Sequence, residues 1–308
     1  MDVKALLQKL WESPIEELTY INKGFSPDEK YRLQLADGER YFIKLCSKEY
    51  ATRKQEEFTH MKNFKAMGVP VPEPIFFYTF DEAPYCVQCF EYIDGKDGED
   101  ALPEMTEEQQ YNVGVQAGRA LRKINTVPLE HASETWESYR MNKYDNYMLA
   151  VKDLKDVRLD LKSVDAFVQQ HKHLLKNRPL VFNHDDFHPC NLMVSSQGLE
   201  AVIDFDRFDW EDPYHEFYKM ALFSRNISVP FCVGQVHGYF DDEVPEDFWD
   251  YYALYAAMTF AADIVWSTRF SQDQIEHSYT RLSRILEDHD HFKRCMPKWY
   301  AEYDAGEM

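Results

Sequence analysis

The strongest constraint on the fold is the segment F-N-H-D-D-F-H-P-C-N at residues 182–191, together with Asp204, which follows thirteen residues after Asn191. Three apolar runs flank these polar residues, at 180–182, 192–194 and 199–203. The last two runs are separated by S-S-Q-G, and apolar runs around a glycine-containing turn are typical of a β-hairpin. The pattern therefore predicts strands that bring Asp204 close to the polar residues of the segment.

Three residues of this segment, His184, Asp186 and Asn191, follow the spacing H-x-D-x-x-x-x-N. In protein kinases a loop with this spacing carries an Asp that accepts the substrate hydroxyl proton and an Asn that binds magnesium, while a second metal-binding Asp follows the loop. We therefore expect Asp186 to be the catalytic base and Asn191 and Asp204 to bind Mg²⁺, with His184 supporting the loop backbone. Each residue alone is better explained by a cap or a turn. The joint pattern favours phosphoryl transfer.

A lysine within an apolar strand provides a second candidate site residue. Lys44 lies in the run Y-F-I-K-L, residues 41–45, as the nucleotide-binding lysine of kinases lies in a strand. Residues 53–67 have a helical composition, with a loosely amphipathic pattern of apolar side chains. Glu57 on this helix is the expected ion-pair partner of Lys44, and Glu56 is the alternative one residue away.

The chain resembles the aminoglycoside phosphotransferase family, which shares the kinase-like fold with choline, fructosamine and macrolide kinases. The landmarks follow the family's order from about residue 20 to about residue 220, and they are 41–45, Glu57, 68–72, 90–95, 184–191, 203–206 and Asp212-Pro213. The resemblance implies the roles given above for Asp186, Asn191 and Asp204. It also implies that Lys44 binds nucleotide phosphates and that Glu57 is its ion-pair partner.

The resemblance further implies an α+β, two-lobed protein-kinase-like fold. An N-terminal antiparallel sheet with one helix would bind the nucleotide, and a larger, mainly helical C-terminal lobe would carry the catalytic and acceptor sites. The length of 308 residues exceeds the usual size of a single core. Residues 94–100 are acidic and contain two glycines, which is typical of a loop. We therefore place the domain boundary between residues 1–93 and residues 94–308.

The expected cofactors are ATP or GTP, with Mg²⁺. In the family the strand that ends near Tyr92 leads into the hinge between the lobes, so backbone groups of Phe90 and Tyr92 would meet the base. The sequence Gly24-Phe25-Ser26 precedes the strand expected at 31–35 and is a candidate for the loop over the phosphates. Ser26 is the expected contact, although the loop lacks a G-x-G-x-x-G pattern.

Two acidic residues are candidates for contact with the acceptor. The family commonly has Asp three residues after its Asp-Pro pair, where this chain has Glu216. Asp263 lies in an apolar stretch expected to form one helix from Phe248 to about Ser267, and a buried carboxylate needs a partner. That partner would be either an arginine or the ammonium group of a substrate.

Charge and composition limit the classes of partner. The formal net charge of −20 argues against nucleic-acid binding, which needs clustered Lys and Arg, and it suits a small cationic acceptor with a hydroxyl group, such as an aminoglycoside. No run of about 18 apolar residues is present, so neither a membrane span nor a signal peptide is expected. Six cysteines without framework-like spacing fit a reducing compartment, and we expect a cytoplasmic monomer or dimer.

Two other functional classes are compatible with the same residues. A metal-dependent hydrolase could use His184, Asp186 and His188 around zinc or another transition metal. A nucleotide-binding protein without kinase activity would keep the same nucleotide site but transfer phosphate to no acceptor. The sequence does not separate aminoglycoside, macrolide, amino-alcohol and sugar acceptors, because a fold does not determine its substrate.

Overall fold

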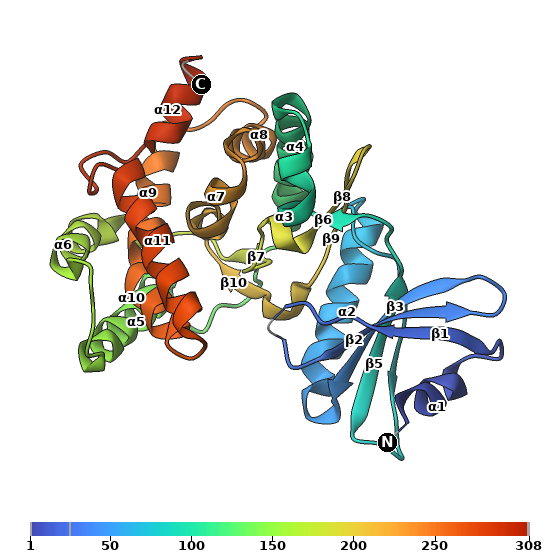
Figure 1. Ribbon diagram of the computed structural model, residues 1–308. Coiled ribbons are helices and arrows are strands. Elements are labelled where there is room, and N and C mark those ends of the chain that lie inside the picture. The colour runs from blue at the N-terminus through green and yellow to red at the C-terminus, as the bar shows by residue number, and fades with distance from the viewer. Residues whose placement is uncertain (1, 25, 307–308) are drawn as a thin grey trace.

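The computed structural model describes residues 2–24 and 26–306, and it divides into a sheet lobe and a helical lobe (Figure 1). The sheet lobe holds a five-stranded antiparallel sheet in the order β1-β2-β3-β5-β4. Its strands are β1 (Ile15–Tyr20), β2 (Glu29–Leu35), β3 (Arg40–Ser47), β4 (Pro74–Thr79) and β5 (Tyr85–Glu91). The short helix α1 (Val3–Leu7) contributes Leu6 and Leu7 to the core of this lobe.

Helix α2 (Ala51–Ala66) follows β3 in the sheet lobe and packs against the helical lobe. Its buried residues Phe58, Met61 and Phe64 recur every three positions, so that they lie on one side of the helix. The ring of Phe64 packs 4.9 Å from that of Phe182 and 5.5 Å from that of Phe205, measured between centroids. The helix therefore anchors the sheet lobe to the two segments that carry the predicted catalytic loop and Asp204.

Two small sheets support those segments. Strand β7 (Val181–Asn183) pairs with β10 (Asp209–Glu211), and β8 (Leu192–Ser195) pairs with both β6 (Lys96–Asp97) and β9 (Gly198–Val202). The predicted hairpin is thus formed by β8 and β9. The catalytic loop leaves β7 and enters β8, and Asp204 follows β9, which brings the two halves of the sequence pattern to the same end of the strands.

The helical lobe follows β6 and contains most of the remaining residues (Figure 1). Its helices are α3 (Gly98–Ala101), α4 (Glu107–Ile124), α5 (Trp136–Ala150), α6 (Leu161–His171), α7 (Arg225–Ile227), α8 (Val229–Phe240), α9 (Phe248–Met258), α10 (Phe260–Ser267), α11 (Gln272–Asp288) and α12 (Lys298–Asp304). Thr106 and Gln109 form a capping box that begins α4.

Helices α4 and α8 approach each other closely because glycine lies at the contact on both. A Cβ atom at Gly118 of α4 would lie 2.1 Å from the Gln235 carbonyl oxygen, and one at Gly234 of α8 would lie 2.1 Å from the Tyr111 carbonyl oxygen. No side chain fits at either distance. The crossing of α4 and α8 therefore depends on direct contact between the two helix backbones.

The structure corrects one expected helix. The stretch from Phe248 to Ser267 forms two helices, α9 and α10, which meet at Thr259. The Thr259 hydroxyl donates to the Ala256 carbonyl, and such a local bond competes with the helical hydrogen bonds.

We propose that the boundary between the two domains lies between residues 93 and 94. Within the described residues, no helix is long and apolar enough to span a bilayer.

Candidate active site

The loop after β7 carries His184 and Asp186. His184 is fully buried, and its Nε2 lies 2.9 Å from the Ile203 carbonyl oxygen, which ties the loop to the residue before Asp204. Burial lowers the pKa of His184 to about 4, so the ring is neutral and donates this bond. The structure thus places His184 where it supports the loop backbone and not where it could exchange protons with a substrate.

Asp186 is held from two sides. The Asn191 side-chain amide donates to the Asp186 carbonyl oxygen at 2.9 Å and to Oδ2 at 3.2 Å. The Lys219 ammonium donates to Oδ1 at 2.6 Å, and His188 Nε2 lies 3.5 Å from the same oxygen. Burial opposes ionisation of Asp186, but the Lys219 ammonium and His188 outweigh it and hold the pKa of Asp186 below its usual range. Asp186 is therefore an oriented carboxylate.

Asp204 lies opposite this loop and contacts the sheet lobe. Its φ of +63° places it in the left-handed region, which is uncommon for a residue with a side chain. Asp204 Oδ1 accepts from Lys44 Nζ at 2.6 Å, and Oδ2 lies 3.6 Å from Lys30 Nζ. The two lysines outweigh the effect of burial and hold the pKa of Asp204 below its usual range.

Glu57, and not Glu56, is the helix α2 partner of Lys44. Glu57 is buried, and its Oε1 lies 3.2 Å from Lys44 Nζ, whereas Glu56 is exposed. Gln88 of β5 donates to the second Glu57 oxygen at 3.0 Å. Burial alone would lower the pKa of Lys44, but the carboxylates of Asp204 and Glu57 outweigh it and raise this pKa well above its usual value. Lys44 is therefore a charged residue in fixed position.

Two further lysines of the sheet lobe reach this site and were not expected from the sequence. Lys30 of β2 is directly opposite Lys44 in the strand register. Lys54 of α2 pairs with Asp28 and with Asp206, two residues after Asp204. All three lysines are buried, and lysine is almost never buried without a partner. For Lys30 the sequence signal was a lysine inside a strand, which is also common at exposed strand edges, and for Lys54 it was a lysine on a helix, which is usually solvated.

The expected nucleotide contacts Phe90 and Tyr92 lie at the C-terminal end of β5 and just beyond it. Phe90 is buried within β5, opposite Phe42 of β3, whereas Tyr92 is the first residue after β5 ends at Glu91. Backbone groups inside a sheet are engaged in its ladder, so Tyr92 is better placed than Phe90 for a hinge contact.

The loop between β1 and β2 lies over the junction of the lobes. Ser26 Oγ accepts from the Asp28 backbone N–H at 3.2 Å, while Phe25 lies outside the described residues. Lys23 of the same loop forms ion pairs with Asp97 and Asp100, at the start of the helical lobe. The loop is therefore tied to both lobes.

Glu216, a candidate for contact with the acceptor, is buried against the backbone of the catalytic loop. Its Oε2 accepts from the Asp185 N–H at 2.8 Å and its Oε1 from the Phe187 N–H at 2.9 Å. Burial, with the nearby Asp185 carboxylate, raises the pKa of Glu216 to about 8. Both oxygens are used by the loop backbone, so Glu216 supports the loop on either side of Asp186.

Asp263 is also placed differently from the acceptor role considered for it. Its carboxylate accepts two hydrogen bonds from Arg281, at 2.6 and 2.8 Å, and one from the Ser278 hydroxyl at 2.6 Å. All three residues are buried between α10 and α11. Of the two partners proposed for Asp263, the arginine is the one present, and this pair joins two helices.

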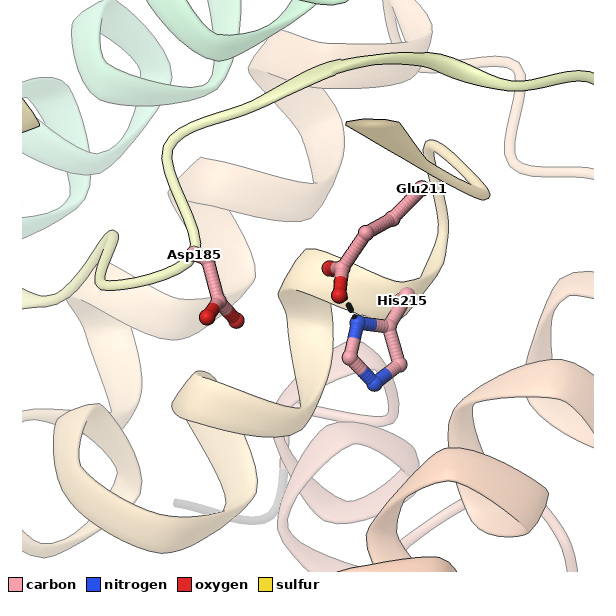
Figure 2. Close-up of side chains that lie close together, drawn as sticks. All are labelled: Asp185, Glu211 and His215. Atoms are coloured by element: carbon pink, nitrogen blue, oxygen red, sulfur yellow. Dashed lines mark hydrogen bonds and ion pairs between the residues drawn. The ribbon is translucent and has the colours of Figure 1, made fainter. Parts of the chain in front are cut away.

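One group of three side chains among the described residues has metal-ligand spacing. It consists of Asp185 in the catalytic loop and of Glu211 and His215, which lie close to it. Figure 2 shows Glu211 hydrogen-bonded to His215, with Asp185 on the neighbouring loop; the His215 Nδ1 to Glu211 Oε2 distance is 2.6 Å. Burial raises the pKa of Glu211 to about 7 and lowers that of His215 well below its usual value. Burial therefore favours the uncharged form of both side chains.

The metal-dependent hydrolase considered above required His184, Asp186 and His188. His184 Nε2 is committed to Ile203, and His188 faces Asp186 at 3.5 Å. Among the described residues these three side chains do not form a group with metal-ligand spacing. The geometry therefore gives this alternative no support.

The residues present fit a magnesium ion between the lobes. Asn191 uses its amide nitrogen for Asp186, which leaves its amide oxygen for a metal, and Asp204 contributes a carboxylate. Mg²⁺ takes one or two protein oxygens and completes its shell with phosphates and water. The site could therefore position a nucleotide phosphate between Lys44 and Asp186.

The fold and the candidate site together define a kinase-like small-molecule phosphotransferase. The fold consists of a sheet lobe and a helical lobe, and the site residues between them are Lys44, Asp186, Asn191 and Asp204. A protein-family comparison agrees with this class. The chain belongs to the phosphotransferase enzyme family, whose model, abbreviated APH, matches residues 17–255. A search of curated protein sequences found no match.

Solved structures with similar folds come from the same class. Aminoglycoside phosphotransferase APH(4)-Ia, as a thermostable mutant with ADP and hygromycin B, has a TM-score of 0.68 and 15% identity over 93% of this chain and 98% of that chain. Amicoumacin kinase hAmiN, in complex with AMP-PNP, Ca²⁺ and Ami, has a TM-score of 0.62 and 14% identity over 96% of each chain. Aminoglycoside 2'-phosphotransferase-IIIa with GDP has a TM-score of 0.67 and 13% identity over 91% of this chain and 96% of that chain. At these identities the likeness shows the fold.

Proposed function

We propose that this protein transfers the γ-phosphate of ATP or GTP, with Mg²⁺, to a hydroxyl group of a small cationic molecule such as an aminoglycoside. One observation carries the proposal: Lys44 from the sheet lobe contacts Asp204 at 2.6 Å, while Asn191 contacts Asp186 on the other side of the same site. These are the parts that phosphoryl transfer needs, namely a phosphate-binding cation, metal ligands and an acceptor-orienting carboxylate.

Each side chain has a distinct task in this reaction. Lys44, fixed by Glu57, binds the nucleotide phosphates, and Asn191 and Asp204 hold Mg²⁺, which neutralises phosphate charge when it is bound. Asp186 accepts the hydrogen bond of the acceptor hydroxyl and aligns its oxygen for attack on phosphorus. Because the pKa of Asp186 is held low, it serves mainly to orient the hydroxyl, and it takes the proton as the P–O bond forms.

The proposed acceptor class is supported by the net charge of the chain and by ligands bound to proteins of similar fold. The net charge of −20 favours a cationic ligand over an anionic one. A protein of similar fold binds hygromycin B together with ADP, and another binds Ami together with AMP-PNP. A third contains GDP, so the test must include both nucleotides.

The first experiment measures Mg²⁺-dependent release of ADP or GDP across aminoglycosides, macrolides, choline-like amines and sugars, for wild type and Asp186→Asn. We expect acceptor-dependent turnover that falls about 10²–10⁴-fold in the variant, with nucleotide binding retained. Nucleotide binding without turnover on any acceptor would favour the binding-protein alternative. Full turnover by Asp186→Asn would show that the site is elsewhere.

A further inference from the structure

Lys219 is a buried lysine that lies outside the sequence pattern of residues 182–206 and contacts the proposed catalytic carboxylate. It comes from the segment between the short turn His215–Phe217 and the π-helical turn Met220–Ser224. Its side chain is 5% exposed, and its Nζ lies 2.6 Å from Asp186 Oδ1. π-helical turns are rare and occur often at functional sites. The one here begins directly after Lys219.

The Lys219 ammonium has hydrogen-bonding capacity to spare. An ammonium carries three donors, and among the described residues Asp186 is its single hydrogen-bond partner. The rings of Tyr218 and Phe223 lie 5.0 and 5.7 Å from Nζ and accept no conventional hydrogen bond there. A buried ammonium with two unused donors needs further acceptors, and phosphate oxygens are strong ones.

The distances place these donors beside the reaction. An acceptor hydroxyl must lie about 2.6–3.2 Å from Asp186 and about 3–3.5 Å from the phosphorus it attacks. An ammonium that already contacts Asp186 Oδ1 is therefore within reach of an oxygen of the transferring group. Lys44 approaches from the sheet lobe through Asp204, and Lys219 approaches from the helical lobe through Asp186. The proposed site is thus contacted by one buried lysine from each lobe.

We propose that Lys219 is a catalytic residue that binds the transferring phosphoryl group, through the N–H groups that Asp186 leaves free. This inference rests on the proposed phosphotransferase function and adds a charge donor to it. Negative charge spreads over the three equatorial oxygens of the phosphoryl group in the transition state, and a fixed cation there lowers the barrier. Lys219 binds this charge more strongly than it binds the free nucleotide diphosphate.

The test compares Lys219→Met with Lys219→Arg, which keeps the charge. The control is Lys143→Met. Lys143 of α5 and Lys219 both act electrostatically on the buried Glu211 carboxylate, but Lys143 lies over the Tyr139 ring and forms no ion pair with Asp186 among the described residues. Each protein is titrated with Mg²⁺·ADP alone and with Mg²⁺·ADP plus aluminium fluoride, which mimics the phosphoryl group in transfer. We expect Lys219→Met to bind ADP as wild type does and to lose about 10²-fold or more in affinity for the aluminium fluoride complex. Lys219→Arg should regain much of that loss, and Lys143→Met should lose none.

A double variant separates direct contact from an effect through Asp186. If Lys219 binds the phosphoryl group, Lys219→Met weakens the aluminium fluoride complex further in an Asp186→Asn background. No further loss in that background would overturn the proposal, and so would wild-type affinity of Lys219→Met. Thermal unfolding of each variant shows whether a loss of affinity comes from misfolding. If Lys219→Met is misfolded, the affinity of Lys219→Arg for the aluminium fluoride complex tests the proposal instead. The absence of ADP binding by wild type would instead refute the proposed function, and this inference with it.

Discussion

Lys44 Nζ lies 2.6 Å from Asp204 Oδ1, although 160 residues separate the two along the chain. The contact joins a central strand of the sheet lobe to the end of the β8–β9 hairpin. It also pairs the proposed phosphate-binding cation with a proposed metal ligand. Nucleotide and Mg²⁺ would insert between these charges, so the pair holds the two lobes in register for a ligand that bridges them.

The Glu57–Lys44 pair should set nucleotide affinity. Glu57→Gln keeps the shape of the side chain but removes the charge that fixes Lys44 at 3.2 Å. We expect the KM for nucleotide to rise about tenfold, which corresponds to about 1.4 kcal/mol, since hydrogen bonds to charged groups contribute about 1.5–3 kcal/mol. Glu56→Gln, one residue away and exposed, is the matched control and should match wild type in steady-state kinetics. Equal effects of the two changes would contradict the assigned pairing.

Removal of the metal should stop turnover reversibly. Chelation with EDTA is expected to abolish nucleotide-dependent phosphate transfer, and excess Mg²⁺ should restore it, because the site offers oxygen ligands from Asn191 and Asp204. Asp204→Asn should raise the Mg²⁺ concentration for half-maximal rate by about 10-fold or more. Turnover that zinc supports and magnesium does not would point to different chemistry.

Burial of Glu211 should make stability depend on pH. Its pKa is about 7 in the folded protein and about 4.5 when unfolded, so between these values the unfolded state releases a proton that the folded state keeps. The wild type therefore loses stability as pH rises from about 4.5 to about 7. Glu211→Gln cannot ionise, so its free energy of unfolding relative to wild type should improve by about 2.5 kcal/mol between pH 5 and pH 8.

Urea unfolding at both pH values measures this difference. Glu200→Gln, at an exposed position of β9, provides the control for changes unrelated to burial. A stability difference between Glu211→Gln and wild type that stays constant across the range would show that Glu211 is ionised in the folded protein throughout.

The Asp263–Arg281 pair should affect stability and not acceptor binding. Asp263→Ala leaves the buried Arg281 guanidinium without its carboxylate, so the free energy of unfolding should fall by about 3–5 kcal/mol. The KM for acceptor should stay as in wild type, measured below the unfolding transition. Asp273→Ala, exposed on the neighbouring helix α11, should change neither quantity. An increase in acceptor KM alone would return Asp263 to the acceptor site.

Local sequence patterns predicted the parts of the site that the chain encodes within one loop or one helix turn. The H-x-D-x-x-x-x-N spacing is such a pattern, and the structure places Asp186 and Asn191 in contact as that spacing implies. Lys44 in the preceding strand predicted a glutamate partner on the following helix, and the structure shows that this partner is Glu57 and not Glu56. These inferences needed only the direction of one strand and one helix.

The residues that sequence reasoning missed reach the site through long-range packing. Lys30 becomes informative only when β2 is placed opposite Lys44, and Lys219 only when its segment folds beneath the catalytic loop. On a sequence, a lysine in a strand or a helix is most simply a solvated residue. The contacts of Glu216 could not be predicted for the same reason, because its partners are backbone N–H groups and no side-chain pattern indicates them.

The glycine crossing of α4 and α8 limits where this lobe can vary during evolution. A methyl group at Gly118 or Gly234 would overlap a carbonyl oxygen of the other helix, so neither helix can accept even the smallest substitution there without moving. By contrast, α10 and α11 meet through side chains such as Asp263 and Arg281, which can be exchanged as a pair. Changes in the packing of this lobe should therefore arise through the side-chain-packed helices, while α4 and α8 can keep their close approach only with glycine at these contacts.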